Sequence, residues 1–80
     1  IQATVVAEQA FLFADVSIES GSVAELARGS LLYVFDRNDG TPRWYRAVSR
    51  EGQEGWIAAS DVELSWIDPL TVNRDVFLSQ

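Results

Sequence analysis

The side chains most often used in catalysis are few in this chain. It contains no His and no Cys, and all six of its basic residues are Arg. A nucleophile such as Ser needs a neighbouring base, and only carboxylates are left to act as one. Glu51 and Glu54 could form a glycosidase-like pair, but they flank a turn, where acidic side chains are normally solvated. We therefore expect no catalytic residues and no enzyme activity.

An acidic run at residues 36–40 is the nearest approach to a metal-binding motif. It reads Asp-Arg-Asn-Asp-Gly, which fails the spacing of a calcium loop and lacks the Glu that would complete the coordination. Asn, Asp and Gly in succession are explained by turn geometry alone. The sequence thus predicts a turn there, with no metal and no cofactor.

Composition and charge narrow the function classes further. Eighty residues with 48% hydrophobic and 22% charged side chains suit one small globular domain. The net charge of −6 argues against nucleic acid, since phosphate binding needs a clustered positive surface. No apolar run approaches the length that spans a bilayer, so we expect no membrane insertion. The absence of Met, including at position 1, suggests a processed or excised fragment, in which case any export signal would lie outside it.

The hydrophobic pattern is that of short strands throughout. Turn residues gather at 15–22, 36–42 and 51–54, and the apolar runs between them have no helical period. At most one 3₁₀ turn is expected, at residues 58–60. Alternation then predicts an all-β core built from Val5, Leu12, Val23, Leu26, Leu32, Val34, Tyr45, Ala47, Ile57 and Val62.

Alternation also assigns side chains to the opposite face of the sheet. Tyr33 and Phe35 fall there on one strand, and Trp44 and Val48 fall there on the next. Gly55 interrupts a strand, which predicts a bend or a close approach of a neighbouring backbone.

The order of these segments resembles a known bacterial family. The segments are LARG at 26–29, LLYV at 31–34, WYRAV at 44–48 and GWIAASDV at 55–62. This order is similar to that of bacterial SH3-like (SH3b) domains, and the resemblance covers roughly residues 4–64. It implies a small SH3-like barrel of five or six strands over residues 1–65. In eukaryotic SH3 domains a Pro and a Tyr stand at the positions of Ala58 and Asp61, so polyproline binding is not expected.

The resemblance implies a function and a location as well. It suggests a non-catalytic binding or targeting module of a larger exported bacterial protein, extracellular or in the cell envelope. Such a module would recognise cell-wall peptide, glycan or a protein partner. The alternative is an architectural role, as a spacer or self-association unit of a surface assembly.

Nine aromatic residues exceed what so small a core can hide, and they suggest where a ligand would bind. We expect a groove between the loops at 15–22 and 36–42, floored by Trp44, whose acidic loops would favour cationic partners. The alternative is that most of the rings are partly buried caps of the barrel ends. The candidate ligand-binding residues are Phe13, Asp15, Asp36, Asp39, Trp44 and Trp56.

Residues 66–80 form a C-terminal extension beyond the family pattern. This segment is a linker, a docked tail or the start of another repeat, since Thr71-Val72 and Phe77-Leu78 faintly echo Thr4-Val5 and Phe11-Leu12. Its apolar side chains favour docking, either on its own barrel or on a neighbouring copy. The face around Tyr33, Phe35 and Val48 is the surface expected to receive it.

Overall fold

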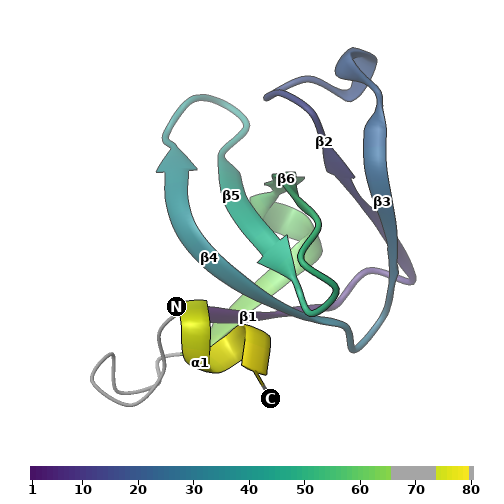
Figure 1. The fold of residues 1–80 in the computed structure, drawn as a ribbon. Coiled ribbons are helices and arrows are strands. Elements are labelled where there is room, and N and C mark those ends of the chain that lie inside the picture. Colours follow the sequence, from purple (N-terminus) through teal and green to yellow (C-terminus); the bar gives the residue numbers. More distant parts are fainter. Residues whose placement is uncertain (66–73, 80) are drawn as a thin grey trace.

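The computed structural model describes residues 1–65 and 74–79, and within them the chain is built almost entirely of strands (Figure 1). The strands are β1 (Gln2–Val5), β2 (Gln9–Phe13), β3 (Ser22–Ala27), β4 (Leu31–Asn38), β5 (Trp44–Ser49), β6 (Glu54–Ala58) and β7 (Val62–Ser65). Two 3₁₀ turns, η1 (Ile18–Ser20) and η2 (Ala59–Asp61), and one helix, α1 (Arg74–Ser79), complete the list. The all-β prediction is confirmed, with seven strands in place of five or six.

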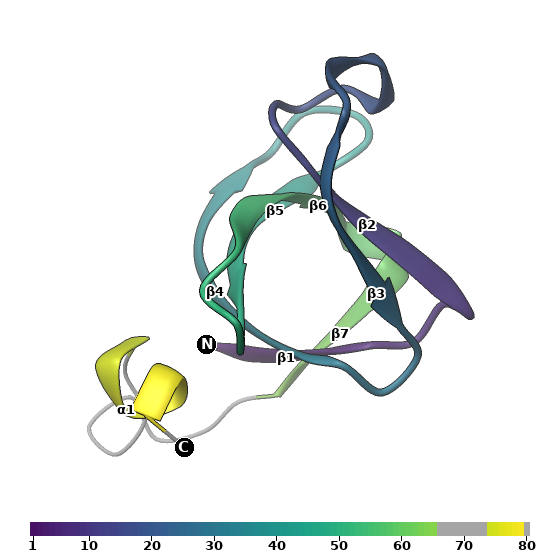
Figure 2. The same ribbon diagram turned by 45° about the vertical axis from the view of Figure 1, so that its right-hand side comes forward.

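All seven strands belong to one antiparallel sheet in the order β3-β2-β6-β5-β4-β1-β7. β1 lies between β4 and β7, so the last strand returns to the first. Figure 2 shows the strands following one another around the core, with α1 outside them on the side of β1 and β4. The loop after β2 and the loop after β4 lie together at the opposite end from the β5–β6 hairpin (Figure 1).

The core consists of the side chains that alternation turns inward. Leu12, Leu32 and Ile57 are fully buried, each on a different strand. The complete buried cluster is Ala3, Val5, Ala10, Leu12, Leu26, Leu32, Val34, Ala47, Ile57 and Val62, with Tyr45 packed partly against it. The predicted core is therefore confirmed apart from Val23, which is 46% exposed. Val23 has no partner on β2, because the register shifts between the pairs Leu12–Ala24 and Phe13–Ser22, and regular alternation fails at this bulge.

The structure differs from the sequence prediction at the end of β4 and in its helices. Residues 36–38 belong to β4 and are not a loop, because they pair with β5 beyond a β-bulge between Val34 and Asp36. Pairing of Asp36 with Arg46 and of Asn38 with Trp44 across the two strands outweighs the preference of Asp and Asn for turns. The expectation of at most one 3₁₀ turn and no regular helix is also wrong, since η1 and η2 both form and α1 extends over six residues. The apolar residues of α1, Val76, Phe77 and Leu78, are adjacent and show no helical period, so the sequence pattern does not predict this helix.

Gly55 marks a close approach of β2 to β6. A Cβ atom at this position would lie 2.8 Å from the backbone oxygen of Phe13 and 3.1 Å from Cβ of Leu12. Neither atom is the end of a flexible side chain, so β2 packs against β6 here only because residue 55 has no side chain. The predicted close approach is confirmed.

Replacing Gly55 with Ala is expected to lower the free energy of unfolding by about 1–3 kcal/mol, the usual cost of overpacking. Gly40→Ala is the matched control, because its Cβ would meet the movable side chain of Asn38 and its backbone is not in the left-handed region. Urea unfolding followed by fluorescence measures both variants. Equal midpoints for Gly55→Ala and Gly40→Ala would contradict this account of the β2–β6 contact.

Truncating Ile57 to Ala should cost about 2–5 kcal/mol, because the side chain is fully buried in the core. Val23→Ala removes a comparable aliphatic group from an exposed position and should change stability by less than about 1 kcal/mol. Chemical denaturation would refute the core assignment if Val23→Ala proved the more damaging of the two.

Candidate functional site

The outer side of the sheet carries a row of aromatic rings around one arginine. Cross-strand pairing places Phe13 opposite Trp56, Trp56 opposite Arg46, and Arg46 opposite Asp36. These positions alternate with the core residues of the same strands, so the row faces away from the core. We define the aromatic strip as Phe13, Trp56 and Arg46 of this row together with two rings that contact them, Phe11 and Phe35.

Contacts within the strip form two groups, Phe11 with Phe13 and Arg46 with Trp56 and Phe35, which the backbone register of Phe13 and Trp56 places side by side. The Phe11 and Phe13 ring centroids are 6.1 Å apart, and the guanidinium carbon of Arg46 lies 5.7 Å from the Trp56 centroid. The same guanidinium carbon is 5.9 Å from the Phe35 centroid. Arg46 is therefore held between two rings, a geometry that stabilises the cation through the ring quadrupoles.

Arg46 keeps hydrogen-bonding capacity in this position. Its Nε atom is buried and makes no hydrogen bond within the described residues, and its nearest carboxylate oxygen, Oε1 of Glu54, is 3.7 Å away. The side chain as a whole stays partly exposed. Nε itself is out of reach of a partner, so an acceptor would approach the exposed part of this immobilised guanidinium, where little side-chain entropy remains to be lost on binding.

Trp44 does not have the role that the sequence predicted for it. It is only 7% exposed, and the Phe13 ring lies over it edge-on at 5.9 Å with an interplanar angle of 85°. The prediction that Trp44 floors an open groove is therefore wrong. Alternation assigned its face correctly, but the β2 hairpin covers this end of the outer face. Phe13 and Trp56, also predicted as site residues, are brought together on the strip.

The three predicted acidic residues lie apart on exposed segments and are engaged locally. Asp39 pairs with Nε of Arg37 and Nε of Arg43, each at 3.2 Å. Asp15 accepts from the backbone N–H of Val16, and Asp36 accepts from that of Arg37. Within the described residues no group of three such side chains is placed to hold a metal ion. The charge that was expected to attract cationic partners is thus largely offset at Asp39.

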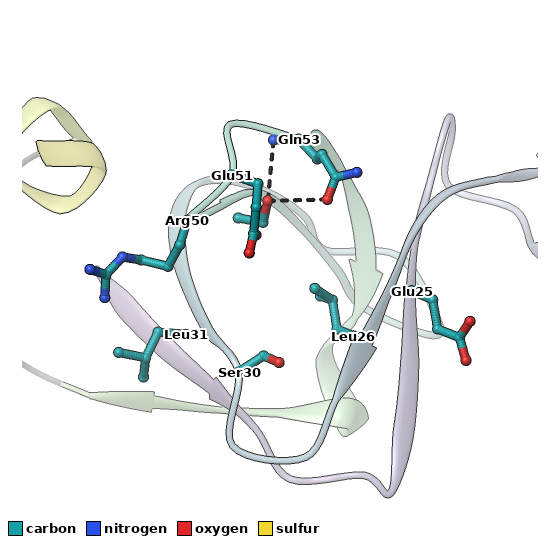
Figure 3. A pocket seen from close by; sticks show the side chains of 8 residues that line it. Glu25, Leu26, Ser30, Leu31, Arg50, Glu51 and Gln53 are labelled. Atoms are coloured by element: carbon teal, nitrogen blue, oxygen red, sulfur yellow. Dashed lines mark hydrogen bonds between the residues drawn. The ribbon is translucent and has the colours of Figure 1, made fainter. Parts of the chain in front are cut away.

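A hollow of about 460 Å³ lies at the other end of the sheet, between the β3–β4 turn and the β5–β6 hairpin (Figure 3). Ser49 is its buried polar residue, and its hydroxyl accepts from the backbone N–H of Gln53 at 3.2 Å. Leu26 points into the hollow and Glu25 points away from it (Figure 3). The polar groups here stabilise the hairpin turn and do not converge on a common point, so we assign the hollow a structural role.

The C-terminal helix packs on the outer face beside the strip. Phe77 is 0% exposed, with its ring centroid 6.1 Å from that of Tyr33 and 5.3 Å from the guanidinium carbon of Arg50. Arg74 lies over the Phe35 ring at 5.0 Å. Val48, in register with Tyr33, is fully buried. The predicted docking surface is confirmed for residues 74–79, whereas Trp66, Ile67 and Leu70 lie outside the described residues.

Sequence reasoning missed several residues of this face as site members. Phe11, Arg46 and Phe35 form most of the strip, although only rings near the loops were selected. The signal was present, because all three fall on the outward side of alternating strands. No family model, curated protein or solved structure matches this chain. No helix in the described part of the chain is long and apolar enough to cross a membrane.

Trp44→Ala is expected to act on stability before it acts on binding. Removing a buried aromatic side chain costs about 3–5 kcal/mol, enough to unfold much of a small domain. Ile18→Ala is the control, because Ile18 is 73% exposed on η1 and its loss should cost less than about 0.5 kcal/mol. If the guanidinium unfolding curves of the two variants coincide, Trp44 is not packed as described.

Proposed function

We propose that this chain is a non-catalytic binding module with an SH3-like barrel architecture. The arrangement of strands supports the architecture: η2 precedes a final strand that pairs with the first, in the order on which the SH3b resemblance rests. The residue inventory supports the absence of catalysis, since no His, Cys or Lys is available. The module belongs to a larger exported bacterial protein and acts outside the cell or in the envelope, as the resemblance implies.

The observation that carries the binding role is the aromatic strip. Half-buried rings supply a large contact area and lose little conformational entropy when a partner covers them. Arg46, fixed between Trp56 and Phe35, provides hydrogen-bond donors at the centre of that area. Aromatic and Arg side chains are also the types that dominate binding energy at protein interfaces.

The strip favours a partner with two chemical features. An apolar or planar group would cover the rings of Phe11 and Trp56, and a carbonyl or carboxylate oxygen would accept from Arg46. Cell-wall peptide, glycan or a protein segment can each offer this combination. This differs from the cationic ligand expected from the acidic loops, because Asp39 is already paired with two arginines.

A second candidate function is self-association in a surface assembly. It is favoured by β3, which lies at one end of the sheet and carries the exposed side chain of Val23. Strands in this position can add a strand from another copy through backbone hydrogen bonds. Light scattering separates the two roles, since association through β3 would raise the molar mass with protein concentration and Val23→Lys would abolish that rise.

Binding to soluble peptidoglycan fragments and to intact cell-wall preparations is the direct test of the proposed function. Phe11→Ser and Arg46→Gln each alter the strip, and at least a tenfold loss of affinity is expected, corresponding to about 1.4 kcal/mol. Ile18→Ser is the matched control, because it removes an exposed apolar side chain from η1, away from the strip. Undiminished binding by both strip variants, each shown to be folded by circular dichroism, would overturn the proposal.

A further inference from the structure

The contacts of α1 define a second recognition site on the outer face. We call this site the helix seat and define it by Tyr33, Phe35, Arg50 and Glu54. We propose that the helix seat is a receptor for helical segments that carry an arginine three residues before an aromatic anchor, and that α1 occupies it as a built-in, displaceable ligand. This inference extends the proposed function, since it takes the outer face as the binding surface.

Phe77 is the anchor of the bound segment. It is completely buried although its helix neighbours Val76 and Leu78 stay exposed, which is the pattern of one side chain inserted into a partner surface. Among the described residues, its ring lies against the Tyr33 ring and the Arg50 guanidinium. It takes no part in the barrel core, which lies on the other side of the sheet.

Arg74 supplies the second element of recognition. It lies one helical turn before Phe77, so both side chains reach the same surface. Its guanidinium carbon is 5.0 Å from the Phe35 ring, and its Nη1 atom is 3.5 Å from Oε1 of Glu54. Because Arg74 both stacks on Phe35 and pairs with Glu54, the helix seat would bind α1 more tightly than an apolar helix that offers only an aromatic residue.

The helix is held by docking and not by its own stability. Six residues are too few to form a stable helix alone, and the ion pair between Arg74 and Glu54 is partly exposed. Occupancy therefore depends on Phe77 and on the connection to β7 through residues 66–73, which keeps the local concentration of α1 high. A partner segment with the same anchor displaces α1 when its concentration exceeds the effective concentration that this connection gives to α1.

The helix seat and the aromatic strip share Phe35, and Glu54 of the seat pairs with Arg46 of the strip. Phe35 lies between Arg46 and Arg74, and Oε1 of Glu54 is 3.7 Å from Nε of Arg46 and 3.5 Å from Nη1 of Arg74. Release of α1 would free Phe35 and Glu54 to rearrange around Arg46. Binding at the strip and occupancy of the seat are therefore expected to be coupled.

The test uses the 80-residue chain and a fluorescein-labelled peptide with the sequence of residues 66–80. Anisotropy titrations should show that Phe77→Ala, whose own helix no longer competes, binds the peptide at least about tenfold more tightly than the wild-type chain. Leu78→Ala is the matched control on the same helix and should behave as the wild type. A peptide carrying Phe77→Ala should bind to neither chain.

Two outcomes would overturn the inference: no peptide binding by a folded Phe77→Ala chain, or equal binding by this variant and the wild type. If Phe77→Ala does not fold, Arg74→Glu serves instead, because Arg74 is partly exposed and its reversal repels Glu54. That chain should bind the wild-type peptide more tightly than the wild-type chain does, and equal binding would reject the inference. Ile18→Ser, on the exposed turn η1, should leave peptide binding unchanged. Cell-wall binding by Phe11→Ser is measured in a separate assay without the peptide, so failure of the proposed function is distinguished from failure of this inference.

Discussion

The arrangement of this domain depends on the contact between β2 and β6 at Gly55. Only a residue without a side chain lets the Phe13 carbonyl and the Leu12 Cβ come so close to β6. That contact joins the β2–β3 hairpin to the β4–β5–β6 sheet and sets Phe13 opposite Trp56. The same placement lays the Phe13 ring over Trp44. The close approach of the β2 and β6 backbones at Gly55 therefore positions both the core residues on one side of the sheet and the strip residues on the other.

The start of β4 and the end of β5 are covered on both of their faces. Leu32 and Ala47 face the core, whereas Tyr33 and Val48 face the layer formed with Phe77. A strand buried on both sides reads as a nearly continuous apolar run, as residues 31–35 do. The second layer explains how the Phe77 ring is kept out of water although it lies outside the core.

Much of the fold could be predicted because alternation is a local signal. It identified the core, the outer face, and Tyr33, Phe35 and Val48 as the surface that receives the tail. It could not reveal that Trp44 is covered, since that depends on where the β2 hairpin lies in space. The helix was missed for a similar reason, because packing of Phe77 stabilises a segment with no helical period. The pairing of Asp39 with two arginines likewise needs the folded loop.

The bulge in β4 has a consequence for changes in chain length. Residues 32–34 pair with 47–49 and residues 36–38 pair with 44–46, and the two registers differ by one residue. Phe35 is that extra residue. A chain lacking it would retain every pair of the β4–β5 ladder, yet it would lose the ring that lies between Arg46 and Arg74. A one-codon deletion would thus spare the sheet and disconnect the two halves of its outer surface, so related chains of different length would differ in communication across that surface before they differ in fold.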